Sequence, residues 1–229
     1  MRKFLFTITA LLCLAGTSLA AENAGARSVH TIGFNIPIQS QTWEYEAYRT
    51  ELGDYDVELD MSLVGFDFFY NHLSVSDSRF SRFIDCEIGY ASMSVDKQRL
   101  ENSSSIDPDM GKLTGFDTRF LFGIGFAPVN LEKFILAIHG TFGVSLTVVE
   151  GKQNGITSEA VSFNTFLGAN AQGAFRLSDT FGLTGGIHMY TNLVGGGVFA
   201  YDIDDSGESC LIKSGDFNID LKFGISWIL

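Results

Sequence analysis

Apolar and polar residues alternate with a period of two along much of this chain, and this pattern limits the possible folds more than any other feature. The first such segment, residues 31–39, places four apolar residues on one face, Ile32, Phe34, Ile36 and Ile38. Because successive side chains of a β-strand point to opposite faces, this spacing predicts a strand with one apolar and one polar face. The same alternation predicts strands at 56–70, 84–91, 115–126, 134–148, 161–175, 180–189 and 217–229.

The second segment changes its pattern midway. Its apolar residues are first Val57, Leu59, Met61 and Leu63, and then Val64, Phe66, Phe68 and Tyr70. One extra residue in a strand reverses the face on which the following side chains lie. We therefore expect a β-bulge near Leu63 and Val64, with Glu58 and Asp60 on the polar face.

Alternation is typical of soluble and of transmembrane barrels, so the composition has to distinguish them. The apolar rows are rich in Phe, Leu and Ile, while only 18% of residues are charged and 21 are Phe. Segments of roughly nine or more residues match the length of a tilted transmembrane strand. The prediction is an all-β, antiparallel up-and-down transmembrane β-barrel of about eight strands in the bacterial outer membrane. A soluble periplasmic ligand-binding barrel is the third-ranked alternative.

The N-terminus has the pattern of an export signal. Arg2 and Lys3 precede an apolar stretch at 4–14, and Ser18 and Ala20 occupy the positions that a signal peptidase reads. We expect residues 1–20 to be a signal peptide and residues 21–229 to form a single barrel domain.

The connections between the predicted strands differ in length. Those at 41–55, 96–112, 150–160 and 191–213 are long and polar, whereas those at 127–133 and 177–180 are tight and that at 71–79 is intermediate. Outer-membrane barrels have short periplasmic turns and longer extracellular loops. If the first strand runs outward from the periplasm, every long connection lies outside the cell.

The last strand, FNIDLKFGISWIL, resembles the C-terminal assembly signal of bacterial outer-membrane barrels. Apolar residues stand at alternate positions back from the terminus, and Phe223, Ile225, Trp227 and Leu229 are the assembly-signal residues. Leu229 departs from the usual Phe. The mature chain is similar to the small eight-stranded family that includes the OmpX, OmpA and OmpW barrels, and the segment TIGFNIPI resembles treponemal barrels. The resemblance implies outer-membrane lipid and the barrel-assembly machinery as partners.

Charged residues on the polar faces are expected to lie inside the barrel. The predicted interior network comprises Glu58, Asp60, Asp85, Glu87, Asp117, Arg119, Asp220 and Lys222. We expect the cations and carboxylates to pair, because charges held away from bulk water need partners. The functional alternative is a cation path or a proton site.

Other motifs are weak. Residues 202–207 match the first half of a calcium loop, but Lys213 stands where a bidentate Glu is required. The segment HMYTN at 188–192 faintly resembles the His–Ser pairing of barrel enzymes that trim lipid A, with Tyr190 and Thr191 as poor substitutes for Ser. We predict no enzyme activity, no cofactor and no metal.

Two further side-chain predictions concern the cysteines and the aromatic residues. We expect Cys86 and Cys210 to stay unbridged, because one is predicted on a lipid-facing strand and the other in a loop. The aromatic residues near the predicted strand ends, Trp43, Tyr45, Tyr70, Phe80, Tyr190 and Trp227, fit girdles at the two membrane interfaces.

Two functions compete for a barrel of this kind. A net charge of −12 argues against nucleic acid as a partner. The first function is a surface interaction, adhesion or structural role of a monomer that binds extracellular or host ligands through loops 41–55, 96–112 and 191–213. The second is a narrow channel for small hydrophobic molecules. Such a conduit needs an apolar interior, so the predicted charges favour the first.

Overall fold

The computed structural model describes residues 27–49, 53–100, 112–153, 156–201, 207–212 and 216–228, and almost all of them lie in β-strands. The strands are β1 (Arg27–Arg49), β2 (Gly53–Val75), β3 (Phe80–Leu100), β4 (Lys112–Asn130), β5 (Phe134–Gln153), β6 (Ile156–Arg176), β7 (Phe181–Tyr201), β8 (Gly207–Ile212) and β9 (Phe217–Ile228). No helix long and apolar enough to cross a membrane occurs among these residues. The predicted signal peptide lies outside the described residues.

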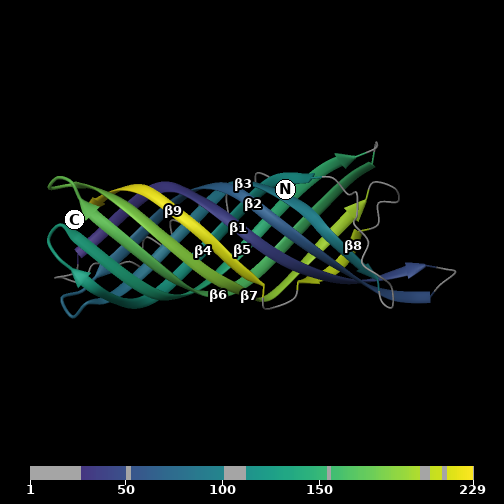
Figure 1. Cartoon of the computed structure of the whole chain (residues 1–229), viewed down its shortest axis with the longest axis horizontal. Coiled ribbons are helices and arrows are strands. Elements are labelled where there is room, and N and C mark those ends of the chain that lie inside the picture. The colour runs from purple at the N-terminus through teal and green to yellow at the C-terminus, as the bar shows by residue number, and fades with distance from the viewer. Residues whose placement is uncertain are drawn as a thin grey trace.

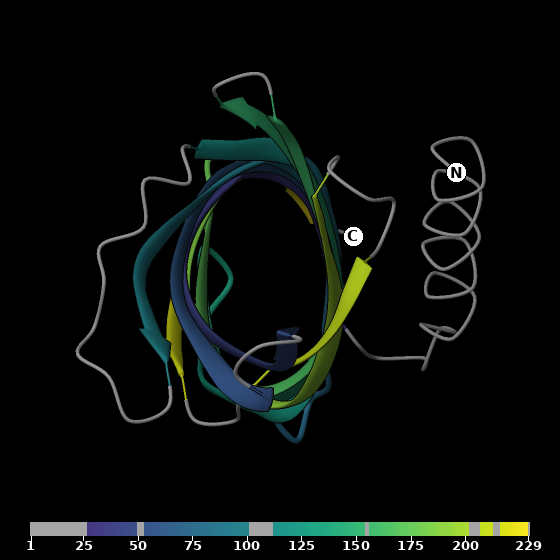
Figure 2. The ribbon, with the colours of Figure 1, turned by 90° about the vertical axis from the view of Figure 1, so that its right-hand side faces the viewer.

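The strands close into a ring. Each of β1 to β6 pairs antiparallel with the next strand, and β9 pairs with both β7 and β1. The short β8 also pairs with β7 and β1, so β8 and β9 share the eighth position in the ring. The predicted eight-stranded, antiparallel up-and-down barrel is therefore confirmed (Figures 1 and 2).

One end of the barrel, here called the turn end, carries the tight connections. These are residues 76–79, 131–133 and 177–180, and β1 begins and β9 ends at the same end (Figure 1, left). In the first turn, Arg79 adopts a left-handed backbone conformation with φ 65°. The prediction of a longer first turn at 71–79 was wrong, because β2 continues to Val75.

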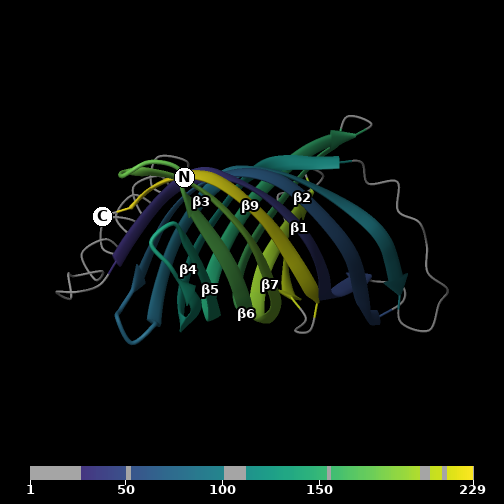
Figure 3. The ribbon, with the colours of Figure 1, turned by 60° about the vertical axis from the view of Figure 1, so that its left-hand side comes forward.

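The predicted long loops are mostly strand. β1 continues to Arg49 and β2 begins at Gly53, so 41–55 is largely the end of a hairpin. In the same way β5 and β6 take up most of 150–160, and β7 and β8 most of 191–213. For 96–112, β3 covers the first residues to Leu100, and 101–111 lie outside the described part. Figures 1 and 3 show these hairpins extending the wall away from the turn end.

The half of the wall nearer the turn end, the turn half, has an outward apolar belt. Phe34, Phe66 and Phe122 are exposed by 45%, 47% and 44%, although each sits within a strand. Most of the inward side chains at this level are polar, as Asn35 and Asp67 illustrate, and a smaller apolar cluster with Leu73 and Ile135 lies inside near the turns. Apolar side chains outside and polar ones inside are the reverse of a water-soluble barrel, and this arrangement matches a surrounding hydrocarbon phase.

The belt ends at a consistent level. Its last apolar residues are Ile38, Val64, Tyr90, Phe116, Val148 and Val161, and the next outward residues are Ser40, Ser62, Ser92, Thr114, Glu150 and Glu159. Beyond this level, in the far half, most inward side chains are apolar, and Gln41 and Ser158 are polar exceptions. The apolar ones form the far core of Trp43, Val57, Leu59, Met61, Leu63, Ala91, Met93, Val95, Leu113, Val149 and Ala160.

The change of pattern at Leu63 and Val64 is therefore not a bulge. The pairing of β1 with β2 keeps one register from Arg27↔Val75 to Arg49↔Gly53. Odd-numbered residues of β2 point inward on both sides of the change. What changes is the medium outside the wall, from lipid to water, so apolar residues move to the inner face without any change in the backbone.

Register shifts do occur elsewhere in the ring. In the pairing of β2 with β3, the partners of Asp60 and Met61 are Lys97 and Val95, so the extra residue is Asp96 of β3. A second shift lies between Thr165 and Phe166 in the pairing of β6 with β7. A third shift lies between Phe126 and Val129 in the pairing of β4 with β5. None of the three falls at the predicted position.

The exchange of apolar and polar faces between the turn half and the far half predicts opposite labelling of two neighbouring residues. In a background with Cys86 and Cys210 replaced by Ser, Asp60→Cys should react rapidly with a water-soluble maleimide in the refolded barrel. Leu59→Cys should be protected, since Leu59 is fully buried in the far core. Both should react after denaturation, which serves as the control. Protection of Asp60→Cys with labelling of Leu59→Cys would restore the bulge hypothesis.

Candidate functional site: a charged network inside the barrel

Strand pairing brings the inward polar residues of six strands together. Asn35 of β1 is paired with Asp67 of β2, and Glu87 of β3 with Arg119 of β4. On the other side of the ring, His188 of β7 is paired with Asp220 of β9. Because every second residue points inward, Asp85, Asp117 and Lys222 fall on the same inner surface.

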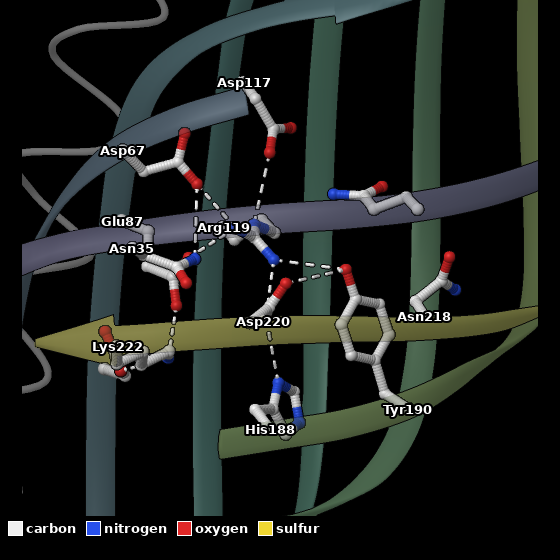
Figure 4. A network of polar contacts seen from close by, with 12 residues as sticks. Asn35, Asp67, Glu87, Asp117, Arg119, His188, Tyr190, Asn218, Asp220 and Lys222 are labelled. Atoms are coloured by element: carbon white, nitrogen blue, oxygen red, sulfur yellow. Dashed lines mark hydrogen bonds and ion pairs between the residues drawn. The ribbon is translucent and has the colours of Figure 1, made fainter. Parts of the chain in front are cut away.

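Arg119 is at the centre of this network (Figure 4). Its guanidinium lies 2.5 Å from Asp67 Oδ2, 2.7 Å from Glu87 Oε2, 3.2 Å from Asp117 Oδ2 and 2.8 Å from Asp220 Oδ2. It also donates a hydrogen bond to the Tyr190 hydroxyl, at 3.1 Å. The planar guanidinium has five N–H donors, so a single arginine can hold several carboxylates at once.

Lys222 extends the network towards β3. Its ammonium group pairs with Asp85 Oδ2 at 2.6 Å and with Glu87 Oε1. Glu87 therefore bridges the two cations, and it also accepts a hydrogen bond from Asn35 Nδ2 at 2.7 Å. The ammonium group of Lys222 further lies 5.7 and 5.8 Å from the ring centroids of Phe69 and Phe83, within the range of cation–π attraction.

These charges are almost completely withdrawn from solvent. The side chains of the described ion pairs are at most 4% exposed, and five carboxylates surround two cations. Charges in such surroundings persist only when they are paired and hydrogen-bonded. The arrangement therefore fastens β2, β3, β4 and β9 to one another across the interior.

An apolar cluster lies beside the network. Phe83 of β3, Leu121 of β4, Phe166 of β6 and Tyr190 of β7 pack together, so side chains from two separate parts of the wall meet inside the barrel. Phe166 fits there because Gly143 has no side chain, since a Cβ at that position would lie 2.3 Å from Phe166 Cζ. Side chains thus occupy the interior at this level, as expected for a ring of about eight strands.

One part of the network has the order of a hydrolytic triad. Asp220 Oδ2 lies 3.2 Å from His188 Nδ1, and His188 Nε2 lies 2.8 Å from Thr141 Oγ1. A hydroxyl oriented by a base that is itself oriented by an acid is the arrangement used in nucleophilic catalysis. The sequence suggested Tyr190 or Thr191 as partner for His188, and the structure instead gives Thr141. Thr141 is only 2% exposed, so its hydroxyl is not presented to a substrate.

The structure places six of the eight predicted network residues inside, namely Asp85, Glu87, Asp117, Arg119, Asp220 and Lys222. The prediction was wrong for Glu58 and Asp60, which point outward from the far half because β2 has no bulge near Leu63. Asp67 was missed, although it alternates with the outward Phe66 and Phe68 and so had to face inward.

The aromatic girdle is only partly as predicted. Phe80 is exposed near the turn end, where Tyr70 and Trp227 also lie. Trp43 is completely buried in the far core, and Tyr190 is 4% exposed and contacts Arg119, so neither belongs to a girdle. The side chain of Tyr45 lies outside the described residues.

The remaining predicted sites are placed as follows. Phe223 and Ile225 of the assembly signal point outward with 60% and 57% exposure, and Trp227 is half-buried, while Leu229 lies outside the described residues. Cys86 lies on the outward face of β3, and neither the side chain of Cys210 nor the acidic segment 202–206 is described. Within the described part, no group of three or more His, Cys, Asp or Glu side chains could hold a metal ion.

Comparison with known proteins identifies the fold but no family. The sequence matches no protein-family profile and no curated protein. The structure is similar to a major outer membrane protein of Thermus thermophilus, with a TM-score of 0.51, 11% identity, and coverage of 86% of this chain and 99% of that one. It also matches the outer membrane protease OmpT of Escherichia coli (TM-score 0.41, 7% identity, coverage 91% and 99%).

A third match, the transport unit of the autotransporter AIDA-I of Escherichia coli, has a TM-score of 0.31, 11% identity, and coverage of 96% and 97%. At these identities the similarity concerns the fold alone. Together with the outward apolar belt, the fold defines the class: the protein is a bacterial outer-membrane β-barrel protein located in the outer membrane. The belt overturns the alternative of a soluble periplasmic barrel, and membership in the OmpX, OmpA and OmpW group stays a prediction.

Removing Arg119 should destabilise the barrel strongly. Arg119→Ala leaves four carboxylates without their shared cation, and breaking a buried pair in this way costs roughly 3–5 kcal/mol. The measurement is the urea midpoint of the refolded barrel in detergent. Arg82→Ala is the matched control, since Arg82 is exposed and should change stability by less than about 0.5 kcal/mol. Equal midpoints for the two variants would show that the network does not hold the barrel together.

Proposed function

We propose that the protein is a closed outer-membrane barrel whose far half acts as a surface interaction module. The observation that carries this proposal is the inversion of polarity along the strands. In the far half, an apolar core lies inside the wall and polar side chains lie outside, as in a water-soluble domain. The far half is therefore built to stand in water beyond the membrane.

The strand lengths support this assignment. A tilted strand of roughly 9–11 residues crosses the hydrocarbon core. β1 and β2 each have 23 residues, and β3, β6 and β7 each have 21. About half of each strand thus remains for the far half. Because short turns face the periplasm in barrels of this class, the far half faces the cell exterior.

The outer surface of the far half offers charge for recognition. Its described outward carboxylates belong to Glu44, Glu58, Asp60, Asp96, Glu150 and Glu159, and its outward ammonium groups to Lys97, Lys112 and Lys152. An excess of carboxylates attracts cationic partners and speeds their encounter. The partner class that fits is a protein or glycan surface with a complementary basic patch, bound by a monomeric barrel without enzymatic activity or cofactor.

A conduit for small hydrophobic molecules is the second candidate. The observation in its favour is the far core, which lines the far half of the interior with apolar side chains. The charged interior that disfavours a conduit is confined to the turn half, where the buried charged residues lie. Passage would still have to cross the buried network around Arg119 and the cluster of Phe83, Leu121, Phe166 and Tyr190. For this reason the surface role is preferred.

The orientation can be tested on intact cells. In the background without native cysteines, Asp60→Cys should react with a membrane-impermeant maleimide, because it lies on the outer face of the far half. Ser78→Cys is the matched control in an exposed turn, and it should react only after the outer membrane is permeabilised. The reverse result would place the far half in the periplasm and refute the surface role.

The two candidate functions differ in conductance. The refolded wild type should give no steady current in a planar bilayer, because ion pairs and packed rings fill the interior. Phe166→Ala removes one of these rings and serves as a variant that could open the barrel. A steady current through the wild type would contradict the closed barrel and favour the conduit.

A further inference from the structure

Three potential metal ligands meet on the outer face of the barrel wall at the turn end. His30 of β1 is paired with His72 of β2, and Tyr70 lies two residues earlier on β2, on the same outward face. His30 Nδ1 lies 2.9 Å from the Tyr70 hydroxyl and 3.3 Å from His72 Nδ1. His30 Nδ1 therefore lies next to both of the other heteroatoms, between the two strands.

A single hydrogen bond at His30 Nδ1 does not account for both of its contacts. The Nδ1 atom of a neutral imidazole either carries one hydrogen or offers one lone pair. His30 Nδ1 has two polar neighbours, the Tyr70 oxygen and His72 Nδ1, and it can form one good hydrogen bond with only one of them. A cation bound by the lone pairs of His30 Nδ1 and His72 Nδ1, with the Tyr70 hydroxyl oxygen beside it, would remove this conflict.

The spacing also fits a metal ion. Ligand nitrogens bind zinc at roughly 2.0–2.1 Å, and in a tetrahedral site two such atoms are about 3.4 Å apart. The separation of the two Nδ1 atoms is 3.3 Å. Imidazole nitrogens suit zinc and copper, and copper(II) is bound most tightly in the series of divalent first-row metals. We propose that His30, His72 and Tyr70 form a binding site for a divalent transition metal of the copper–zinc class, with a fourth position left for water.

The site lies at the seam where the ring closes. His30 is paired with Trp227 of β9, and their rings stack with centroids 5.7 Å apart and an interplanar angle of 6°. A bound ion would therefore join β1 to β2 directly beside the β1–β9 seam. The site is independent of the proposed surface role, because it lies on the opposite end of the barrel.

Trp227 provides an optical signal for binding. The chain has two tryptophans, and the other is Trp43 in the far core. With Trp43→Phe in the background lacking native cysteines, Trp227 is the sole tryptophan. Adding copper(II) to this untagged, refolded barrel should quench its fluorescence at one ion per chain. The electron paramagnetic resonance spectrum should show hyperfine coupling to imidazole nitrogen.

Ligand variants decide between a metal site and a hydrogen-bonded cluster. His72→Gln and Tyr70→Phe should each weaken copper binding by at least about tenfold. Mutating a residue that only hydrogen-bonds to a metal ligand already lowers metal affinity by that factor. His139→Gln is the matched control, because His139 lies inside the barrel against Phe83. It should bind copper like the parent. Retained heat-modifiable migration of each variant in gels verifies its fold.

Three results would overturn the proposal. The first is a parent protein that does not bind copper(II) or zinc(II) at one ion per chain. The second is unchanged affinity in both His72→Gln and Tyr70→Phe. The third is loss of binding in His139→Gln, which would assign the metal to the interior instead.

Discussion

Pairing of the first strand with the last is the interaction on which the rest of this structure depends. Val29 to Ile38 of β1 pair with Ile219 to Ile228 of β9, and this contact turns a sheet into a ring. In lipid an unpaired backbone N–H or C=O group has no water to bind, so an open edge would cost several kcal/mol for each group. Closure also creates the interior in which Arg119 can reach Asp220, a residue 101 positions away.

The pleat of the strands then determines where each side chain goes. One face of every strand lines the interior and the other meets the surroundings, over the whole length of the wall. Because the surroundings change from hydrocarbon to water along the strand, the side chains suited to each face change as well. The same strand, β2, presents Phe66 to lipid and Leu59 to the interior without any shift of register in its pairing with β1.

The sequence predicted the fold well wherever the outward face of a strand is in contact with one medium, lipid or water, along the whole segment. The row from Ile32 to Ile38 faces lipid throughout, so its alternation alone identified the strand and its outward side. Glu58 and Asp60 were misplaced because alternation separates two faces but does not say which medium each one meets. The contacts of Arg119 were beyond sequence reasoning, because they depend on the stagger between strands that are distant along the chain.

The apolar belt ends sharply where the far half begins, and this has a mechanical consequence. If the barrel moved inward, the carboxylates of Glu58 and Asp60 would approach the hydrocarbon, and if it moved outward, Phe66 and Phe68 would be drawn into water. Both displacements are opposed, the first by the desolvation of charge and the second by hydration of apolar surface. The barrel therefore has a fixed depth in the membrane. A pulling force on the far half would be carried by the bilayer as well as by the strands.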